Sequence, residues 1–172
     1  MGLKKEYEIE TITNSDTEVM LETFVKDGIQ AVNKWNGIFA MAILDKEKAC
    51  LHLIRDRFGI KPLYIYEDDT CIAFASEQKV IYKWLDGFDL NTQGIAEYLW
   101  YGNTISENTM AKKMIKMNPA SVYSINLDNV HLNSRHHYWS LPQKSTYKSS
   151  EGKLIENVLD FTRKGCSKTA RK

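Results

Sequence analysis

Residues 55–64 read RDRFGIKPLY and join two apolar, strand-like segments. Gly59 supplies an unusual backbone angle, and Pro62 fixes the approach to the following strand. We expect Asp56 either to pair with a neighbouring arginine or to accept backbone hydrogen bonds in the turn. Because the stretch holds no nucleophile with a base beside it, we interpret it as a charged, hydrogen-bonded corner of a sheet.

The segments around this corner predict β-hairpins, because short apolar runs are separated by polar turn residues. The three predicted hairpins cover residues 37–45 with 49–56, 63–66 with 71–75, and 121–127 with 130–135. Residues 38–44 are apolar at every position. A strand that is apolar on both faces belongs in the middle of a layered fold, and we expect that place for this strand.

Helix signals lie on both sides of the hairpins. The stretch NSDTEVMLETFVKDG, residues 14–28, offers Ser15 or Asp16 as an N-cap, carboxylates in the first turn and Gly28 as a stop. Residues 6–12 alternate polar and apolar and predict a strand. Further helices are predicted over residues 29–34, 76–84, 91–101 and 151–161, with Ile95, Tyr98 and Leu99 as the apolar stripe of the third.

Composition excludes several classes of protein. The chain has 172 residues and a formal net charge of +1, which argues against a dedicated nucleic-acid binder. No apolar run reaches the length of a membrane span, and the first residues lack the apolar region of a secretory signal. We therefore expect a cytoplasmic protein without nucleic-acid or membrane partners.

Cysteine and histidine do not form a metal-binding pattern. Cys50, Cys71 and Cys166 are far apart in the sequence, so a disulfide framework or a structural zinc site is not expected, and a reducing compartment fits. His136 and His137 are adjacent, and in a strand they point to opposite faces and do not share a metal. We expect no metal and no cofactor in this chain.

Several motifs resemble one family in order and spacing. These are NGIFAMAILD, RDRFGIKPLYIY and FASEQKVI, preceded by NSDTE and followed by MIKMNPASVYSI and HHYWSL. Together they resemble the latter part of the glutaminase domain of glutamine-hydrolysing asparagine synthetases, over roughly residues 7–141. The likeness departs at residues 118–120, Asn-Pro-Ala, where the family usually has Pro-Pro-Gly.

The resemblance implies an α+β fold of the N-terminal-nucleophile hydrolase type, an αββα sandwich with two antiparallel sheets, incomplete at the N-terminus. Residues 1–141 would form the C-terminal part of a type-2 glutamine amidotransferase domain. Residues 142–172 would form a linker and the start of the synthetase domain, partly disordered, with the last ten residues poorly ordered. Because upstream strands of the family are not in this sequence, we expect Ile38, Phe39, Met41, Ile43 and Leu53 to be exposed.

The resemblance also implies where the family's chemistry lies. Its glutaminase uses an N-terminal cysteine, but Gly2 stands at position 2 here, and the synthetase Ser-Gly-Gly-x-Asp-Ser loop does not occur. The isolated chain is therefore expected to be inactive, with no catalytic residue assigned. Asp16 matches the aspartate that contacts the α-amino group of bound glutamine. The alternative is that Asp16 is only a helix cap.

We interpret the chain as a fragment of a glutamine-dependent asparagine synthetase-like amidotransferase. The full-length relative would hydrolyse glutamine and pass ammonia to an ATP-activated aspartate or another carboxylate, with ATP and magnesium as cofactors. Its expected partners are the synthetase domain or a homo-oligomer partner. A non-catalytic remnant that binds glutamine or a partner remains the alternative, and the sequence does not identify the acceptor.

Overall fold

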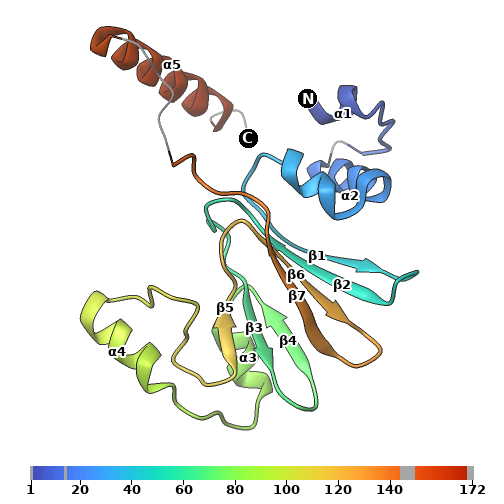
Figure 1. Ribbon diagram of the computed structural model, residues 1–172, viewed down its shortest axis with the longest axis vertical. Coiled ribbons are helices and arrows are strands. Elements are labelled where there is room, and N and C mark those ends of the chain that lie inside the picture. The colour runs from blue at the N-terminus through green and yellow to red at the C-terminus, as the bar shows by residue number, and fades with distance from the viewer. Residues whose placement is uncertain (1, 14, 144–149, 170–172) are drawn as a thin grey trace. The chain divides into compact units, whose positions relative to one another are not determined.

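The computed structural model describes residues 2–13, 15–143 and 150–169. The chain divides into two compact units, Met1–Ser140 and Leu141–Lys172, which are described separately. The first unit combines antiparallel sheets with helices, which confirms the α+β class (Figure 1).

The larger sheet of the first unit has four antiparallel strands in the order β1-β2-β6-β7. Their bounds are β1 Ala40–Asp45, β2 Cys50–Arg55, β6 Ser121–Asn126 and β7 His131–His137. The smaller sheet has the order β4-β3-β5, with β3 Tyr64–Glu67, β4 Ile72–Ala75 and β5 Met114–Lys116. All three predicted hairpins are confirmed, because β1 pairs with β2, β3 with β4 and β6 with β7.

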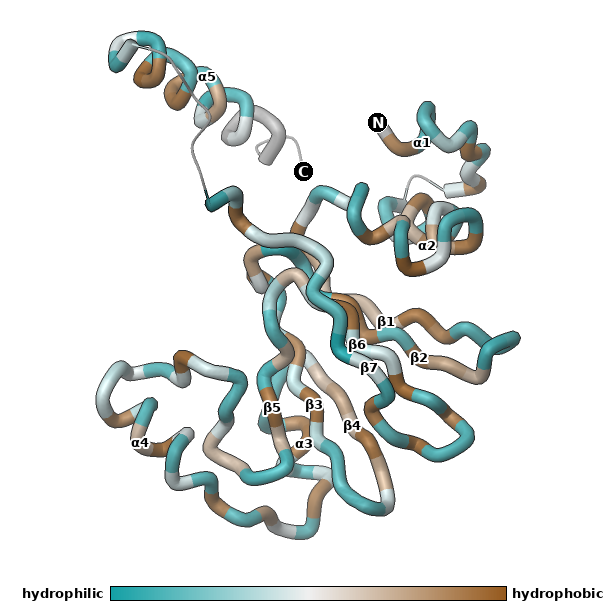
Figure 2. Tube along the Cα trace, in the orientation of Figure 1, coloured by the Kyte–Doolittle hydropathy of each residue, from teal (hydrophilic) through white to brown (hydrophobic). Residues whose placement is uncertain are grey.

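Three apolar clusters show how the layers pack. Leu53 and Tyr123 of the larger sheet pack with Ile65 of the smaller sheet, so the two sheets face each other. The opposite face of the larger sheet packs against Phe24 of helix α2, Asp16–Asp27. The opposite face of the smaller sheet packs against Ile81 of helix α3, Gln78–Trp84. The layers therefore run helix, sheet, sheet, helix, and the apolar strand segments can be followed in Figure 2.

Helix α2 has the bounds that its sequence signals predict. Gly28 ends it with φ of 60°, a conformation that glycine adopts at low cost. The predicted second helix is a 3₁₀ helix, η1, over Gly28–Lys34. The predicted strand over residues 6–12 is wrong: helix α1 spans Gly2–Glu6, and a turn and loop follow it. The alternation of polar and apolar residues over 6–12 is not sufficient for a strand, since among the described residues no neighbouring strand pairs with this segment.

The strand over residues 38–44 was expected in the middle of the layered fold, covered on both faces. Its sheet does lie between α2 and the smaller sheet, but β1 is an edge strand of that sheet, and Leu44 is 50% exposed. The predicted exposure of Ile38 is confirmed at 61%, Phe39 and Met41 are partly buried, and the predicted exposure of Ile43 and Leu53 is wrong, since both side chains are buried. Ile43 packs under α2 and η1, and Leu53 packs between the sheets, so the described elements cover these positions by themselves.

Helix α4, Thr92–Tyr101, follows an Asn91 cap, but its apolar stripe does not form a core. Tyr98 is 46% exposed and Leu99 77% exposed. The helix instead approaches the domain through Gly94, where a Cβ would lie 2.0 Å from the carbonyl oxygen of Thr109. The sequence pattern missed this because glycine carries no hydrophobic signal.

The second unit contains helix α5, Glu151–Thr169, which is longer than the predicted segment 151–161. It continues through most of the last ten residues, which were expected to be poorly ordered. The rest of that expectation falls on residues 144–149 and 170–172, which lie outside the described residues. None of the helices in the described part of the chain is long and apolar enough to cross a membrane.

Candidate functional site

Asp16 is the first residue of α2, and its side chain is exposed. Ser15 before it has extended backbone angles, and its hydroxyl accepts a hydrogen bond from the Thr17 amide at 3.2 Å. Ser15 is therefore the cap, and the alternative that Asp16 is only a cap is wrong. Asp16 instead adds negative charge to the first turn, where the helix dipole favours it.

Glu18 fixes the loop that leads into α2. Its carboxylate accepts hydrogen bonds from the amides of Ile12 and Thr13 at 2.7 and 2.8 Å, and from the Thr13 hydroxyl at 2.5 Å. The Thr13 hydroxyl, followed by these amides, lowers the pKa of Glu18. Sequence reasoning missed this role, although Ser15 and Glu18 have the spacing of a capping box.

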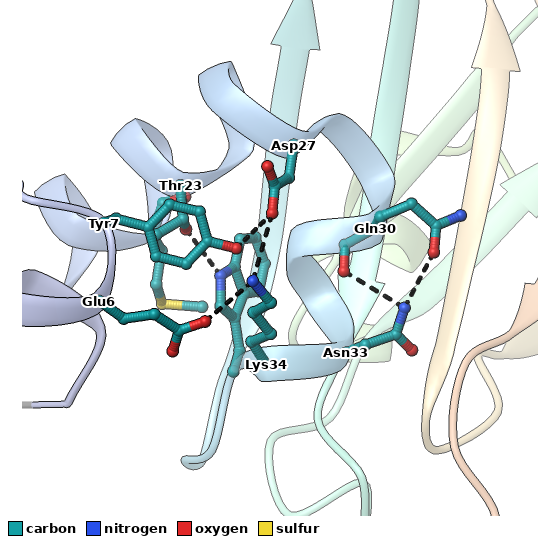
Figure 3. Close-up of polar contacts among 9 residues, drawn as sticks. Glu6, Tyr7, Thr23, Asp27, Gln30, Asn33 and Lys34 are labelled. Carbon is teal, nitrogen blue, oxygen red and sulfur yellow. Dashed lines mark hydrogen bonds and ion pairs between the residues drawn. The ribbon is translucent and has the colours of Figure 1, made fainter.

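The body of α2 is held rigidly against the larger sheet. Val19 and Phe24 are buried beneath it. Thr23 is fully buried, donates to the carbonyl of Met20 at 2.9 Å and accepts from the indole Nε1 of Trp35 at 2.9 Å (Figure 3). Because the helix is anchored at these points, the position of its first residue is fixed relative to the sheet.

A polar cluster ties α1 to α2 and η1, as Figure 3 shows. The Tyr7 hydroxyl donates to Asp27, and this bond raises the pKa of Tyr7. Lys34 lies 4.4 Å from the centre of the Tyr7 ring, 2.9 Å from Glu6 and 3.5 Å from Asp27. Since these groups are largely solvent-exposed, we interpret the cluster as a clasp that orders the start of the chain.

The arginine-rich corner is structural, as predicted. The Arg55 side chain is 5% exposed and donates to three backbone carbonyls: Lys61 at 2.8 Å, Gly59 at 2.7 Å, and Met117. Burial lowers the pKa of Arg55, and the nearby negative charge of Asp56 opposes this effect. The guanidinium of Arg55 is therefore engaged in contacts with the backbone of the corner and of the segment that ends at Met117.

Asp56 also binds the backbone of this corner, through its carboxylate. It is 1% exposed, and its carboxylate accepts from the amides of Phe58 and Ile60 at 3.1 Å and of Lys61 at 3.0 Å. Of the two expected roles, backbone acceptance is the one observed. The Asp56 carbonyl also accepts from the amide of Ala120 at 2.9 Å. Ala120 has φ of 52°, so the family's usual glycine at this position would suit the backbone better.

Neither described thiol is placed as a nucleophile. Cys50 and Cys71 are free and partly buried, and burial raises the pKa of both, which favours the unreactive thiol form. Within the part of the chain that the structure describes, no group of three or more His, Cys, Asp or Glu side chains could hold a metal. The side chain of Cys166 lies outside the described residues.

A buried polar pair was not anticipated from the sequence. His52 of β2 is 6% exposed, and its Nδ1 lies 2.8 Å from the hydroxyl of Ser124, its partner across the strands. Its ring lies 5.6 Å from that of Phe24 in α2, and burial lowers the pKa of His52. Only the strand register, with the two residues 72 positions apart, brings these groups together.

Comparison with known proteins adds to this geometry. A family model described as "Glutamine amidotransferase domain" matches residues 1–139. "Putative asparagine synthetase (glutamine-hydrolyzing) 2" of Methanocaldococcus jannaschii is 33% identical over 160 residues, which cover 91% of this chain and 30% of that protein. "Asparagine synthetase (glutamine-hydrolyzing) 1" of Bacillus subtilis is 29% identical over 155 residues, 86% of this chain and 23% of that protein. The chain thus spans less than a third of the length of these relatives.

Proposed function

Since this chain belongs to the glutamine amidotransferase domain family, we propose that its first unit is the C-terminal part of the glutamine-handling half of an asparagine synthetase-like enzyme. In the whole protein, glutamine hydrolysis would supply ammonia to aspartate, or to another carboxylate, activated by ATP and magnesium. We place this enzyme in the cytoplasm. The second unit would then be the linker and the first helix of the synthetase domain.

The layer order supports a further part of the proposal. A helix, two face-to-face antiparallel sheets and a second helix follow one another in the first unit. This is the arrangement expected of an αββα sandwich of the N-terminal-nucleophile hydrolase type. The arginine-rich corner then serves as the joint between the larger and the smaller sheet, because it connects β2 to β3.

One observation carries the assignment of glutamine binding: Asp16 presents an exposed carboxylate at the first position of an anchored helix. A carboxylate is the natural partner of the α-ammonium group of glutamine, through a charge-assisted hydrogen bond. Ser15 caps the helix, so Asp16 is not needed for that task. Glu18 orders the loop before α2, and the buried face of α2 anchors the helix, so the backbone position of Asp16 is fixed.

Calorimetric titration tests this role. Asp16→Asn removes the charge and leaves the Ser15 cap intact, so we expect glutamine affinity to fall about tenfold, the lower range for a hydrogen bond to a charged group, because the site is exposed. Glutaramic acid, which is glutamine without its α-amino group, should bind the parent and Asp16→Asn equally. Asp69→Asn, the same charge change at an exposed turn position in the β3–β4 hairpin, is the matched control.

The same samples separate the two functional interpretations. Glutamate release by the 172-residue chain would contradict the expected inactivity, for which the support is that burial raises the pKa of both described cysteines. Glutamine binding without glutamate release supports a binding fragment. Equal loss of glutamine and glutaramic acid binding in Asp16→Asn would refute the ammonium contact.

A further inference from the structure

A cleft of about 400 Å³ opens in the first unit beside the smaller sheet. Two aromatic and four charged side chains line it: Tyr66, Phe88, Asp86, Asp89, Lys112 and Lys113. Small-molecule sites have volumes of roughly 300–1,000 Å³ and combine apolar surface with a few polar groups. The size and the lining of this cleft therefore suit a small ligand.

The charges of the cleft are separated by sign. Both acids stand in the loop between α3 and α4, and both bases stand in the turn directly before β5. In the described part of the chain, none of these four side chains forms an ion pair, so their opposite charges lie more than 4.0 Å apart. The cleft thus offers two unpaired charges of each sign around one small space.

The two charged segments hold a fixed position relative to each other. The Lys112 amide donates to the carbonyl of Asp89 at 2.8 Å, which ties the basic turn to the acidic loop. The Lys113 carbonyl accepts from the amide of Glu67 in β3 at 3.0 Å, which ties the same turn to the sheet. The separation of acids from bases is therefore set by the backbone of the fold.

This distribution of charge favours a ligand that carries both signs. A simple anion would be attracted by the lysines and repelled by the aspartates, and a simple cation would meet the reverse. A zwitterion turns its negative group toward the lysines and its positive group toward the aspartates, so both contacts are charge-assisted hydrogen bonds. A free amino acid carries an ammonium group and a carboxylate on one carbon atom and therefore meets both requirements.

We propose that this mixed-charge cleft is a binding site for a free amino acid. The carboxylate of the ligand contacts the lysines before β5, and its ammonium group contacts the aspartates after α3. The site is separate from Asp16, because α2 packs on the larger sheet and the cleft lies at the smaller one. It is therefore independent of the proposed glutamine contact.

Nuclear magnetic resonance of the isotope-labelled 172-residue chain, with L-alanine as the probe, tests the proposal. We expect saturable shifts of the amides of Phe88, Asp89 and Lys112, at millimolar concentrations because the charges are exposed. Propionate, which is alanine without its ammonium group, and ethylammonium, which is alanine without its carboxylate, should give no saturable shift at equal ionic strength. Asp16→Asn should bind alanine as the parent does.

Charge removal then tests the assigned contacts. Asp89→Asn and Lys112→Gln should each weaken alanine binding about threefold to fivefold, the upper range for exposed ion pairs. The double variant keeps the net charge of the parent and should weaken binding about tenfold or more. Asp128→Asn and Lys46→Gln, the same changes at exposed turns of the larger sheet, are the matched controls and should leave binding within about twofold.

Four results would overturn the proposal. Absence of a saturable shift with alanine refutes the site, and equal shifts from propionate and ethylammonium refute the selection of a zwitterion. A double variant that binds alanine as the parent does refutes the assigned contacts. Loss of the alanine response in Asp16→Asn would place the amino acid at the proposed glutamine contact instead of in the mixed-charge cleft.

Discussion

Replacing Asp56 by asparagine tests whether the corner between β2 and β3 stabilises the fold. The aspartate is almost fully buried, and its two carboxylate oxygens accept from three amides, those of Phe58, Ile60 and Lys61. Asparagine keeps one oxygen, which serves the first two amides. Its amide nitrogen then faces the Lys61 amide, so two donors meet and one buried amide loses its acceptor.

The expected loss of stability follows from these contacts. A buried group left without its hydrogen-bonding partner costs about 1–3 kcal/mol. Asparagine also removes the negative charge that opposes the effect of burial on Arg55, which adds to the cost. We expect about 3 kcal/mol in total. For a chain of this size, that corresponds to a fall in melting temperature of about 6–12 °C.

Urea unfolding monitored by circular dichroism gives the free-energy change, and amide hydrogen exchange locates it. The Lys61 amide should exchange faster in Asp56→Asn, while the amides of Phe58 and Ile60 stay protected. Asp69→Asn serves again as the control and should change stability by less than about 0.5 kcal/mol. If Asp56→Asn also changed it by less than 0.5 kcal/mol, the corner would not be a source of stability and our reasoning would fail.

Two further predictions rest on other contacts. Gly94→Ala should destabilise the chain by about 1–3 kcal/mol, despite the better helix propensity of alanine, because the new Cβ would meet the Thr109 carbonyl. Gly152→Ala should instead raise the helix content, because the space around Gly152 is open. Urea unfolding monitored by circular dichroism checks both variants. The pKa of His52 is lowered in the folded state, so the unfolded state binds its proton more readily. Stability should therefore fall as pH drops below about 6.5. His52→Gln should flatten that dependence in melts between pH 7.5 and pH 5, and an unchanged slope would contradict the role of burial.

Local signals predicted much of the architecture. The three hairpins were predictable because polar turn residues separate short apolar runs, and α2 was predictable because Ser15 and Gly28 mark its ends. Backbone acceptance by Asp56 was one of the two roles expected from its place in a tight turn. In each case the decisive contacts join residues that are close in sequence.

The errors arose where distant contacts decide the outcome. The apolar pattern of β1 predicts burial on both faces but does not reveal which strands stand beside it, and β1 is at the sheet edge. The pairing of His52 with Ser124 depends on the register of β2 against β6. The proposed binding role of Asp16 rests only on family resemblance, since an exposed carboxylate at a helix start has no distinctive sequence signal of its own.

The Arg55 side chain also constrains the order in which the chain folds. Two of its carbonyl partners, on Gly59 and Lys61, are local, but the third, on Met117, lies 62 residues further along. During synthesis, the β1–β2 hairpin emerges well before this last partner exists. The guanidinium therefore remains hydrated until β5 and β6 dock, and closing so long a loop costs entropy before its contacts form. Completion of the corner is a late folding event, so its mutations should mainly accelerate unfolding and leave the folding rate almost unchanged.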